Sequence, residues 1–441
     1  MDNTKKYVID AVEISSSRIT SGDEDITSLI QDIDIYEHLD LPYLTANITF
    51  VDSLRALERY HFRGGEFITI RLKPHSEADD NIVEKRFAVR SLRHQVKVNE
   101  EAEAGVIELI EDIAFVSSFT NVNKAYNGNP LDIMSKISED FLEKPISTND
   151  IKIFQKNLRL IVPNMRPLDA LRWINNRIST DKGATPFLFS TLSTKSLMMY
   201  DLETLIKADP INTNKPFVYG AIPRLIEEEG SQTHLPILDY NAGSRAHVYD
   251  LMKNGHIGAE YQFYDAFTAK VYKHKFNYGN DIFPILSEKA DLPATMSGSI
   301  EINEKNVMEV PSRRITRVNA SGVYNEGFRR SNSLHEDDKV SDYSLKVKRD
   351  AMRDHFLENS MTIRVPGTGF LNKDDHKTIG NKIRVLFAAN KPKGDGEIKI
   401  DVPKSGDYVI YAAKHTFKAE RYDIHMTGGK LLNFETDVWP S

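Results

Sequence analysis

The chain has 441 residues, of which 40% are hydrophobic and 27% charged, and its formal net charge is −7. This length predicts two to four domains, and the absence of cysteine excludes a disulfide framework, a thiolate nucleophile and a cysteine metal site. Mild acidity does not favour sequence-specific DNA binding, which usually requires a concentrated basic surface. Because the N-terminus lacks the apolar core of a signal peptide and no apolar run reaches ~20 residues, we expect no membrane insertion.

Residues 1–115 are predicted to be mostly β. Apolar and polar side chains alternate in residues 45–51 and 67–72, as in strands with one buried face. A short helix is expected between them, over residues 54–60, and Gly64 and Gly65 turn the chain into the next strand. The spacing suits a small barrel or sandwich. Further candidate strands are residues 8–14, 26–35, 86–92 and 106–115.

Residues 116–205 form a predicted α+β unit. Pro130 and Pro167 each suit the first turn of a helix, where the missing N–H loses no partner. Apolar residues then recur at helical spacing, as Leu131, Met134, Ile137 and Phe141 after Pro130 and as Leu168, Leu171, Ile174 and Ile178 after Pro167. Two short strands are expected at residues 187–191 and 197–200.

The second half of the chain returns to strands around an irregular segment. We expect a helix over residues 241–254, a long extended run over 259–278 and a second helix over 344–357. Asp265 lies among aromatic residues in the extended run, and we favour a strand edge or subunit contact over a buried acid. Strands are predicted at residues 361–365 and 382–387, followed by a final hairpin of residues 405–415 and 419–426.

No specific catalytic motif is present. The sequence has no phosphate-binding loop, no His-Glu-x-x-His zinc helix and no nucleophile elbow. His415 and His425 could bind a metal if strand pairing placed them side by side, but zinc usually takes three or four protein ligands. We therefore favour hydrogen-bonded strand histidines, and we expect no cofactor and no bound metal.

Two carboxylates could be proposed as a glycosidase pair. Glu37 and Asp52 are candidates for the acid and the nucleophile of a wall-degrading enzyme, but nothing in the sequence fixes the separation that this mechanism requires. We favour a simpler interpretation of Glu37, as a loop carboxylate that caps backbone amides or meets a neighbouring subunit.

Four stretches, in order along most of the chain, resemble the central baseplate hub protein of contractile-tailed bacteriophages. The first is residues 35–52 with 62–71, the second residues 162–171 with 186–190, and the third residues 255–278. The fourth is residues 365–367 with 380–386 and 405–422. A long charged segment between Gly367 and Gly380 departs from the family pattern and leaves the length of that hairpin open. At matching places in the first stretch stand Glu37, Pro42, Asp52, Gly64, Gly65 and Glu66.

The resemblance implies an α+β, β-rich fold with two tail-tube-like antiparallel β-barrel domains. The first would occupy residues 1–115, and the second residues 206–278 with 356–441. An α+β domain would occupy residues 116–205 and a loop-rich peripheral lobe residues 279–355.

The resemblance also implies a structural virion protein without enzymatic activity. A homotrimer would present six similar units, join the sixfold tail tube to the threefold spike and form part of the DNA channel. Expected partners are tail tube or tube-initiator proteins, the central spike protein and baseplate wedge proteins. The expected location is the virion tail baseplate, after assembly in the host bacterial cytoplasm. A mildly acidic wall repels phosphates, which suits a conduit that DNA crosses without specific binding.

Ring contacts are predicted at Glu37, Pro42, Asp52, Gly64, Gly65, Glu66 and Gly406. Two alternatives stay open at this point. One is a tail-associated peptidoglycan hydrolase, and the other is the equivalent hub of a phage-derived injection or secretion particle.

Overall fold

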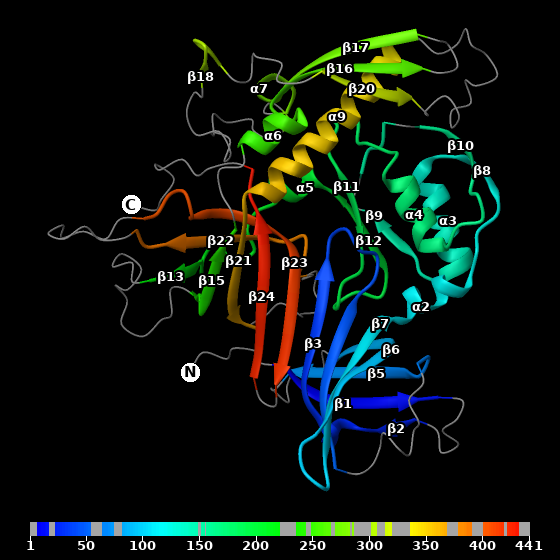
Figure 1. The fold of residues 1–441 in the computed structure, drawn as a ribbon, viewed down its shortest axis with the longest axis vertical. Coiled ribbons are helices and arrows are strands. Elements are labelled where there is room, and N and C mark those ends of the chain that lie inside the picture. The colour runs from blue at the N-terminus through cyan, green and yellow to red at the C-terminus, as the bar shows by residue number, and fades with distance from the viewer. Residues whose placement is uncertain are drawn as a thin grey trace, which may run out of the picture.

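We describe the protein from a computed structural model. Long strands form its centre, and helices are few (Figure 1). No helix among the described residues is long and apolar enough to cross a membrane. The described residues are 7–16, 23–53, 64–74, 82–148, 151–154, 156–220, 235–243, 248–265, 270–282, 285, 301–306, 314–319, 336–367, 378–389, 400–418 and 421–431.

The N-terminal part is a set of antiparallel strands with alternating burial. The predicted strands at 8–14, 45–51 and 67–72 are confirmed, whereas residues 26–35 divide into a 3-10 helix (Thr27–Leu29) and a strand. The helix expected over residues 54–60 lies outside the described residues. The strands are β1 (Tyr7–Ser15), β2 (Glu24–Asp25), β3 (Ile30–His38), β4 (Thr45–Asp52), β5 (Phe67–Pro74), β6 (Val83–Lys97) and β7 (Glu103–Glu111).

The α+β part follows at once. Residues 112–115, expected to extend a strand, instead open a helix, because the Asp112 carboxylate accepts the Ile113 N–H at 2.7 Å in its first turn. Both proline-initiated helices are confirmed, and their apolar stripes pack into one core. The elements are α2 (Asp112–Phe119), β8 (Ala125–Gly128), α3 (Pro130–Leu142), β9 (Ile146–Thr148), β10 (Leu158–Ile161), α4 (Pro167–Asn175), β11 (Pro186–Phe189), β12 (Leu197–Asp201) and α5 (Leu202–Lys207).

The C-terminal part is again β. The predicted strands at 361–365 and 382–387 and the final hairpin are confirmed, but the start of the helix expected over residues 241–254 is a strand. The strands are β13 (Phe217–Tyr219), β14 (Leu235–Pro236), β15 (Asp239–Ala242), β21 (Ser360–Pro366), β22 (Lys382–Phe387), β23 (Gly406–Lys418) and β24 (Arg421–Gly429).

A long insertion interrupts this part between β15 and β21. From here on we call this whole insertion the lobe. The extended run expected over residues 259–278 is an antiparallel hairpin, and its first strand also pairs with a strand of the segment 279–355. The predicted helix at 344–357 is confirmed as part of a longer one. The elements are α6 (Val248–Asn254), β16 (Gly258–Asp265), β17 (Lys270–Asn277), α7 (Tyr278–Asp281), β18 (Glu301–Ile302), β19 (Lys305–Asn306), β20 (Arg314–Asn319) and α9 (Glu336–Glu358).

The two β parts repeat one strand order. Neighbouring strands run β3-β4-β7-β6-β5-β1 in the first part and β15-β21-β24-β23-β22-β13 in the second. Numbered in chain order, without the two-residue strands and the lobe, both read 2-3-6-5-4-1. One pairing differs, since β13 lies parallel to β22 whereas β1 lies antiparallel to β5. The chain therefore contains a structural duplication.

The counterparts β6 and β23 match in detail. Residues 87–94 read FAVRSLRH and residues 408–415 read YVIYAAKH. Each strand shifts register at the same place, between Val89 and Ser91 in β6 and between Ile410 and Ala412 in β23.

The same glycine turn precedes the register shift in both repeats. The Gly65 N–H donates to Val89 O at 3.0 Å, and the Gly380 N–H donates to Ile410 O at 2.7 Å. Both glycines are left-handed, with φ of 83° and 78°, a conformation that other residues adopt only with strain.

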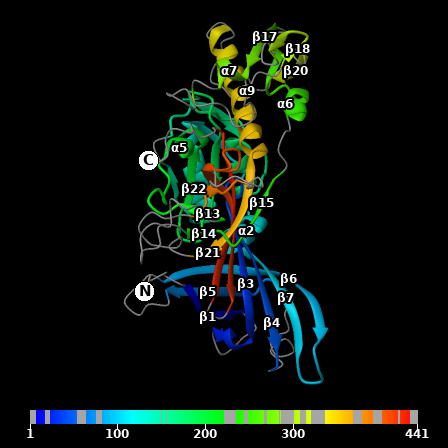
Figure 2. The ribbon, with the colours of Figure 1, turned by 90° about the vertical axis from the view of Figure 1, so that its left-hand side faces the viewer.

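The two repeats share one sheet. β3 of the first pairs antiparallel with β23 of the second over seven residue pairs, from Asp32 opposite Lys418 to His38 opposite Ala412. The resulting 14-stranded sheet and one hydrophobic cluster span both β parts. Figure 2 shows β3 beside the C-terminal strands, with α9 descending from the lobe towards them. We name this pairing the β3–β23 seam.

Helix α9 contacts β17 and β24, and it carries a buried histidine that packs against α7. His355 stacks on Tyr278 with ring centroids 3.9 Å apart, and its Nε2 lies 2.7 Å from the carbonyl oxygen of His256. Burial lowers the pKa of His355 from 6.5 to about 4. The imidazole is therefore neutral in the folded protein near neutral pH.

Acid should weaken this packing within a defined window. Because the unfolded chain binds a proton near pH 6.5 and folded His355 only near pH 4, its contribution is complete above pH 6.5 and is lost as the pH falls to about 4. The loss is on the order of 3 kcal/mol. We expect His355→Phe to flatten the pH dependence of the urea midpoint between pH 6.5 and 4. An unchanged slope would contradict this assignment.

Candidate functional site

Three parts of the chain meet at a buried polar cluster. β3, β6 and β7 come from the first repeat, the loop 190–194 from the α+β part, and β23 and β24 from the second repeat. We name this cluster the polar junction. Its side chains are those of Glu37, Lys85, Glu111, Ser190, Thr191, His415 and Tyr422, and none of them is more than 7% exposed.

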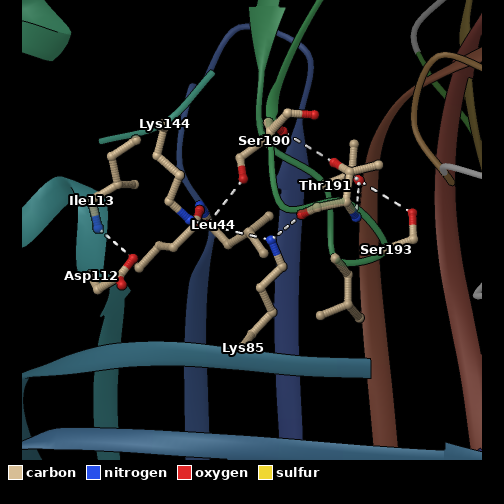
Figure 3. Close-up of polar contacts among 12 residues, drawn as sticks. Leu44, Lys85, Asp112, Ile113, Lys144, Ser190, Thr191 and Ser193 are labelled. Atoms are coloured by element: carbon tan, nitrogen blue, oxygen red, sulfur yellow. Dashed lines mark hydrogen bonds and ion pairs between the residues drawn. The ribbon is translucent and has the colours of Figure 1, made fainter. Parts of the chain in front are cut away.

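Glu111, the last residue of β7, is the principal acceptor. Its Oε2 accepts the Leu44 N–H at 2.8 Å, and its Oε1 accepts the Ser190 hydroxyl at 3.2 Å. Two ammonium groups approach Oε1, Lys85 at 3.5 Å and Lys144 at 3.9 Å. In Figure 3 the Lys85, Lys144 and Ser190 side chains converge between the strands and the loop. One carboxylate thus joins the residue before β4, strand β6, the segment after α3 and the loop 190–194.

The side chain of Lys85 binds the backbone of the loop 190–194. Its ammonium donates to the carbonyl oxygen of Thr194 at 2.6 Å. Burial lowers the pKa of Lys85, and the Glu111 carboxylate opposes this shift. The loop is further closed by Thr191, whose hydroxyl lies 2.9 Å from that of Thr194. A buried ion pair of this kind depends on each partner, because removing one leaves the other charge unpaired.

Glu37 connects the loop to the second repeat. Its Oε1 accepts the Leu192 N–H, and its Oε2 lies 3.4 Å from Nε2 of His415. The other nitrogen of His415 lies 2.7 Å from the Tyr422 hydroxyl. Burial, with the nearby Glu37 carboxylate, raises the pKa of Tyr422 well above its usual value. The phenol therefore stays protonated and can donate to Nδ1 of His415.

The prediction that Glu37 is a loop carboxylate is wrong. Glu37 lies within β3 and is 3% exposed. It does accept a backbone N–H, as expected, but from the loop of another part of its own chain. The strand assignment follows from alternation, since Ile33, Ile35 and Glu37 share the buried face.

Sequence reasoning missed Lys85 and Glu111. The available signal was the alternation of buried and exposed positions along two strands. Glu111 falls on the buried face after Ile107 and Leu109, and Lys85 falls between Val83 and Phe87. A charge at an apolar position of a half-buried strand needs a partner, so each position indicated an internal ion pair.

The other predicted contact residues are spread over the first repeat and β23. Pro42 is buried after β3, where it lines a polar cavity of about 100 Å³ with Arg172, Arg349 and Arg353. Asp52 ends β4 and is 5% exposed. Gly64 and Gly65 form the turn before β5, Glu66 is buried beside it, and Gly406 is buried at the start of β23. Their role in ring contacts stays a prediction.

Glu37 and Asp52 do not form a catalytic pair. β3 and β4 are antiparallel, with Tyr36 opposite Thr45, so Glu37 and Asp52 lie at opposite ends of the pairing. Seven residues of strand separate Asp52 from Thr45, which corresponds to roughly 20 Å. A glycosidase needs its carboxylates within about 10 Å.

His415 and His425 do not form a metal site. Lys414 lies opposite His425 and His415 opposite Ile424, so the two histidines face opposite sides of the sheet. No group of three or more potential ligands occurs among the described residues. The favoured alternative, a hydrogen-bonded strand histidine, is confirmed for His415.

The structure resembles solved phage tail proteins. A tail protein from Neisseria meningitidis aligns with a TM-score of 0.50 at 12% identity, over 96% of this chain and 97% of that chain. The chain has a phage tail protein fold. The 43 kDa tail protein of prophage MuSo2 from Shewanella oneidensis aligns with a TM-score of 0.50 at 7% identity, over 95% and 97% of the two chains. The resemblance inferred from sequence is thereby confirmed at the level of this fold.

A third solved structure also aligns with this chain. A chain of the Francisella PdpA–VgrG complex aligns with a TM-score of 0.46 at 8% identity, over 98% of this chain and 55% of that chain. No protein-family model and no curated protein matches the sequence.

The polar junction should be energetically coupled. We expect Lys85→Met to lower the free energy of unfolding by about 3–5 kcal/mol, because it leaves the Glu111 carboxylate buried beside the more distant Lys144. Adding Glu111→Gln should then cost less than the same change in the wild type. Urea unfolding of the four proteins measures the coupling.

The matched control is the exposed pair Lys124 and Asp140, 3.4 Å apart with side chains 56% and 50% exposed. Lys124→Met should cost about 1 kcal/mol or less. Strict additivity of the two junction changes would contradict the coupling.

Proposed function

We propose that this protein is the trimeric central hub of a contractile tail baseplate. The observation that carries the proposal is the duplication, in which two domains of one strand order are joined edge to edge within a chain. Three copies would supply six such domains, which matches a sixfold tube on one side and a threefold spike on the other.

In this proposal each repeat is one tail-tube-like β-barrel. The β3–β23 seam supports the assignment, because it joins successive domains through strand pairing. Strand pairing between like domains can continue around a ring and leaves fewer open edges to aggregate. The partners would be tube proteins, the spike and baseplate wedge proteins, in the virion tail after assembly in the host cytoplasm.

The polar junction supports a mechanical role. The junction fixes the α+β part against both repeats through contacts that are almost fully buried. Such contacts suit a subunit that transmits force between partners without changing shape. The net charge of −7 suits a channel wall that DNA crosses without binding. The same arguments apply to the hub of a phage-derived injection particle.

The mass of the purified protein tests the proposal. Light scattering across a concentration series should give three times the 50.2 kDa of one chain, and electron microscopy should then show a ring with six similar inner units. A monomer at every concentration would contradict the proposed trimer. Lysis of cell walls by the purified protein would favour the hydrolase alternative.

A further inference from the structure

Half of β6 has one edge without a partner strand among the residues that the structure describes. Val83–Leu72 and Ala88–Phe67 are the outermost pairs between β6 and β5, and the last contact on this side is Val89 with Gly65 and Glu66. From residue 90 to Lys97, β6 pairs with β7 alone among the described residues. We name residues 90–97 the arm of β6. Arg90 and residues 93–97 of the arm are exposed, including Val96 at 62%. Figure 2 shows β6 and β7 extending beyond the body of the sheet.

The same half of β23 is covered. β23 pairs with β22 up to Val409, shifts register and then pairs with β3 from Ala412 to Lys418. β23 and β6 match in sequence, in the position of the shift and in the glycine turn that precedes it. The open arm of β6 is therefore the position that β3 occupies in the second repeat.

The second repeat also has a strand equivalent to β3, and the outer side of this strand has no partner among the described residues. This strand is β15, which pairs with β21 as β3 pairs with β4. Its other side has no partner strand among the described residues. Leu238, which precedes β15, is 39% exposed. In the order of pairing, β15 and β6 lie on opposite sides of the β3–β23 seam, and Figure 1 shows them on opposite sides of the molecule.

Charged side chains lie both at the seam and at the two open edges. In the seam, Lys414 of β23 forms an ion pair with Asp34 of β3 at 2.8 Å, and Thr416 donates to the same carboxylate at 2.7 Å. β6 carries basic residues at the corresponding half, and β15 carries an exposed acid, Asp239. The charges of the two edges are opposite in sign, but the ion pair itself is not repeated. The counterpart of Asp34 is the neutral Asn241, and Arg93, the counterpart of Lys414, pairs with Glu108 of its own chain at 3.0 Å.

We propose that β15 of one copy pairs antiparallel with the arm of β6 of a second copy, reproducing the β3–β23 seam between chains. The inference rests on the proposed trimeric hub and names the surface that closes it. The contact joins two different surfaces, so it generates a closed ring when the rotation between copies is a whole fraction of a turn. With three copies, seams within and between chains alternate around six domains.

The equivalence of the two repeats also predicts which residues lie opposite each other in the contact between two copies. Lys414 and Thr416 lie opposite Tyr36 and Asp34 in the seam. The pairing of β6 with β7 identifies their counterparts in β6. The counterpart of Lys414 is Arg93 and that of Thr416 is Val96, because β6 has one extra residue between Arg93 and Val96. The counterparts of Tyr36 and Asp34, counted through β21, are Gly243 and Asn241. Val96 of one copy therefore lies opposite Asn241 of the next.

Cysteine cross-linking tests this contact cleanly, because the chain contains no cysteine. Directly opposed strand residues have Cα atoms ~4.5–5.5 Å apart, within reach of a disulfide. We expect oxidised Asn241→Cys/Val96→Cys to run as a covalent trimer on a non-reducing gel and as one chain after reduction. Asn241→Cys paired with Gln95→Cys or Lys97→Cys should cross-link less.

Two controls separate this inference from the proposed function. Asn241→Cys/Val271→Cys places the second thiol on β17, at a residue that is 54% exposed, and should give no covalent trimer. Light scattering under reducing conditions gives the mass of each variant before oxidation. A trimer by mass without the Asn241–Val96 cross-link overturns the proposed contact and leaves the hub intact. A monomer overturns both.

Discussion

The pairing of β3 with β23 is the contact on which the rest of the structure depends. It joins strands that lie almost at opposite ends of the sequence, over seven consecutive residue pairs. Backbone hydrogen bonds fix both the direction and the register, because a slip of one residue would turn every buried side chain towards the other face. Ile33 and Ile35 on β3 and Phe417 on β23 are fully buried beside this pairing. Two domains of equal topology thereby become one sheet with one core.

Burial of charge at this contact favours one geometry over others. Glu37, Glu111 and Lys85 are each less than 10% exposed, so each must keep its partners or leave a charge desolvated. A purely apolar contact between the α+β part and the sheet would tolerate sliding. The carboxylate of Glu37 instead requires both the Leu192 amide and the side chain of His415 at fixed positions. We infer that the polar junction contributes to precision of assembly more than to stability.

Strict periodicity made much of the fold predictable. Residues 45–50 alternate without exception, and Pro130 and Pro167 mark where α3 and α4 begin. Local sequence failed where a distant partner decides the outcome. Residues 259–278 read as one extended run, and only the pairing of β16 with β17 and β20 shows the hairpin. Two similar β domains were expected only from the family resemblance, because FAVRSLRH and YVIYAAKH share few identities and become equivalent only through their matching register shifts.

The two repeats differ most in the connection between their second and third strands. Six residues join β3 to β4, whereas the whole lobe lies between β15 and β21. The ends of this insertion meet as neighbours, since the Gly243 N–H donates to the Ser360 carbonyl at 3.1 Å. Because the chain leaves and re-enters the sheet one hydrogen bond apart, the size of the insert is independent of the strand register. Insertions and deletions within the lobe can therefore change its size and leave the pairing of β15 with β21 in the same register.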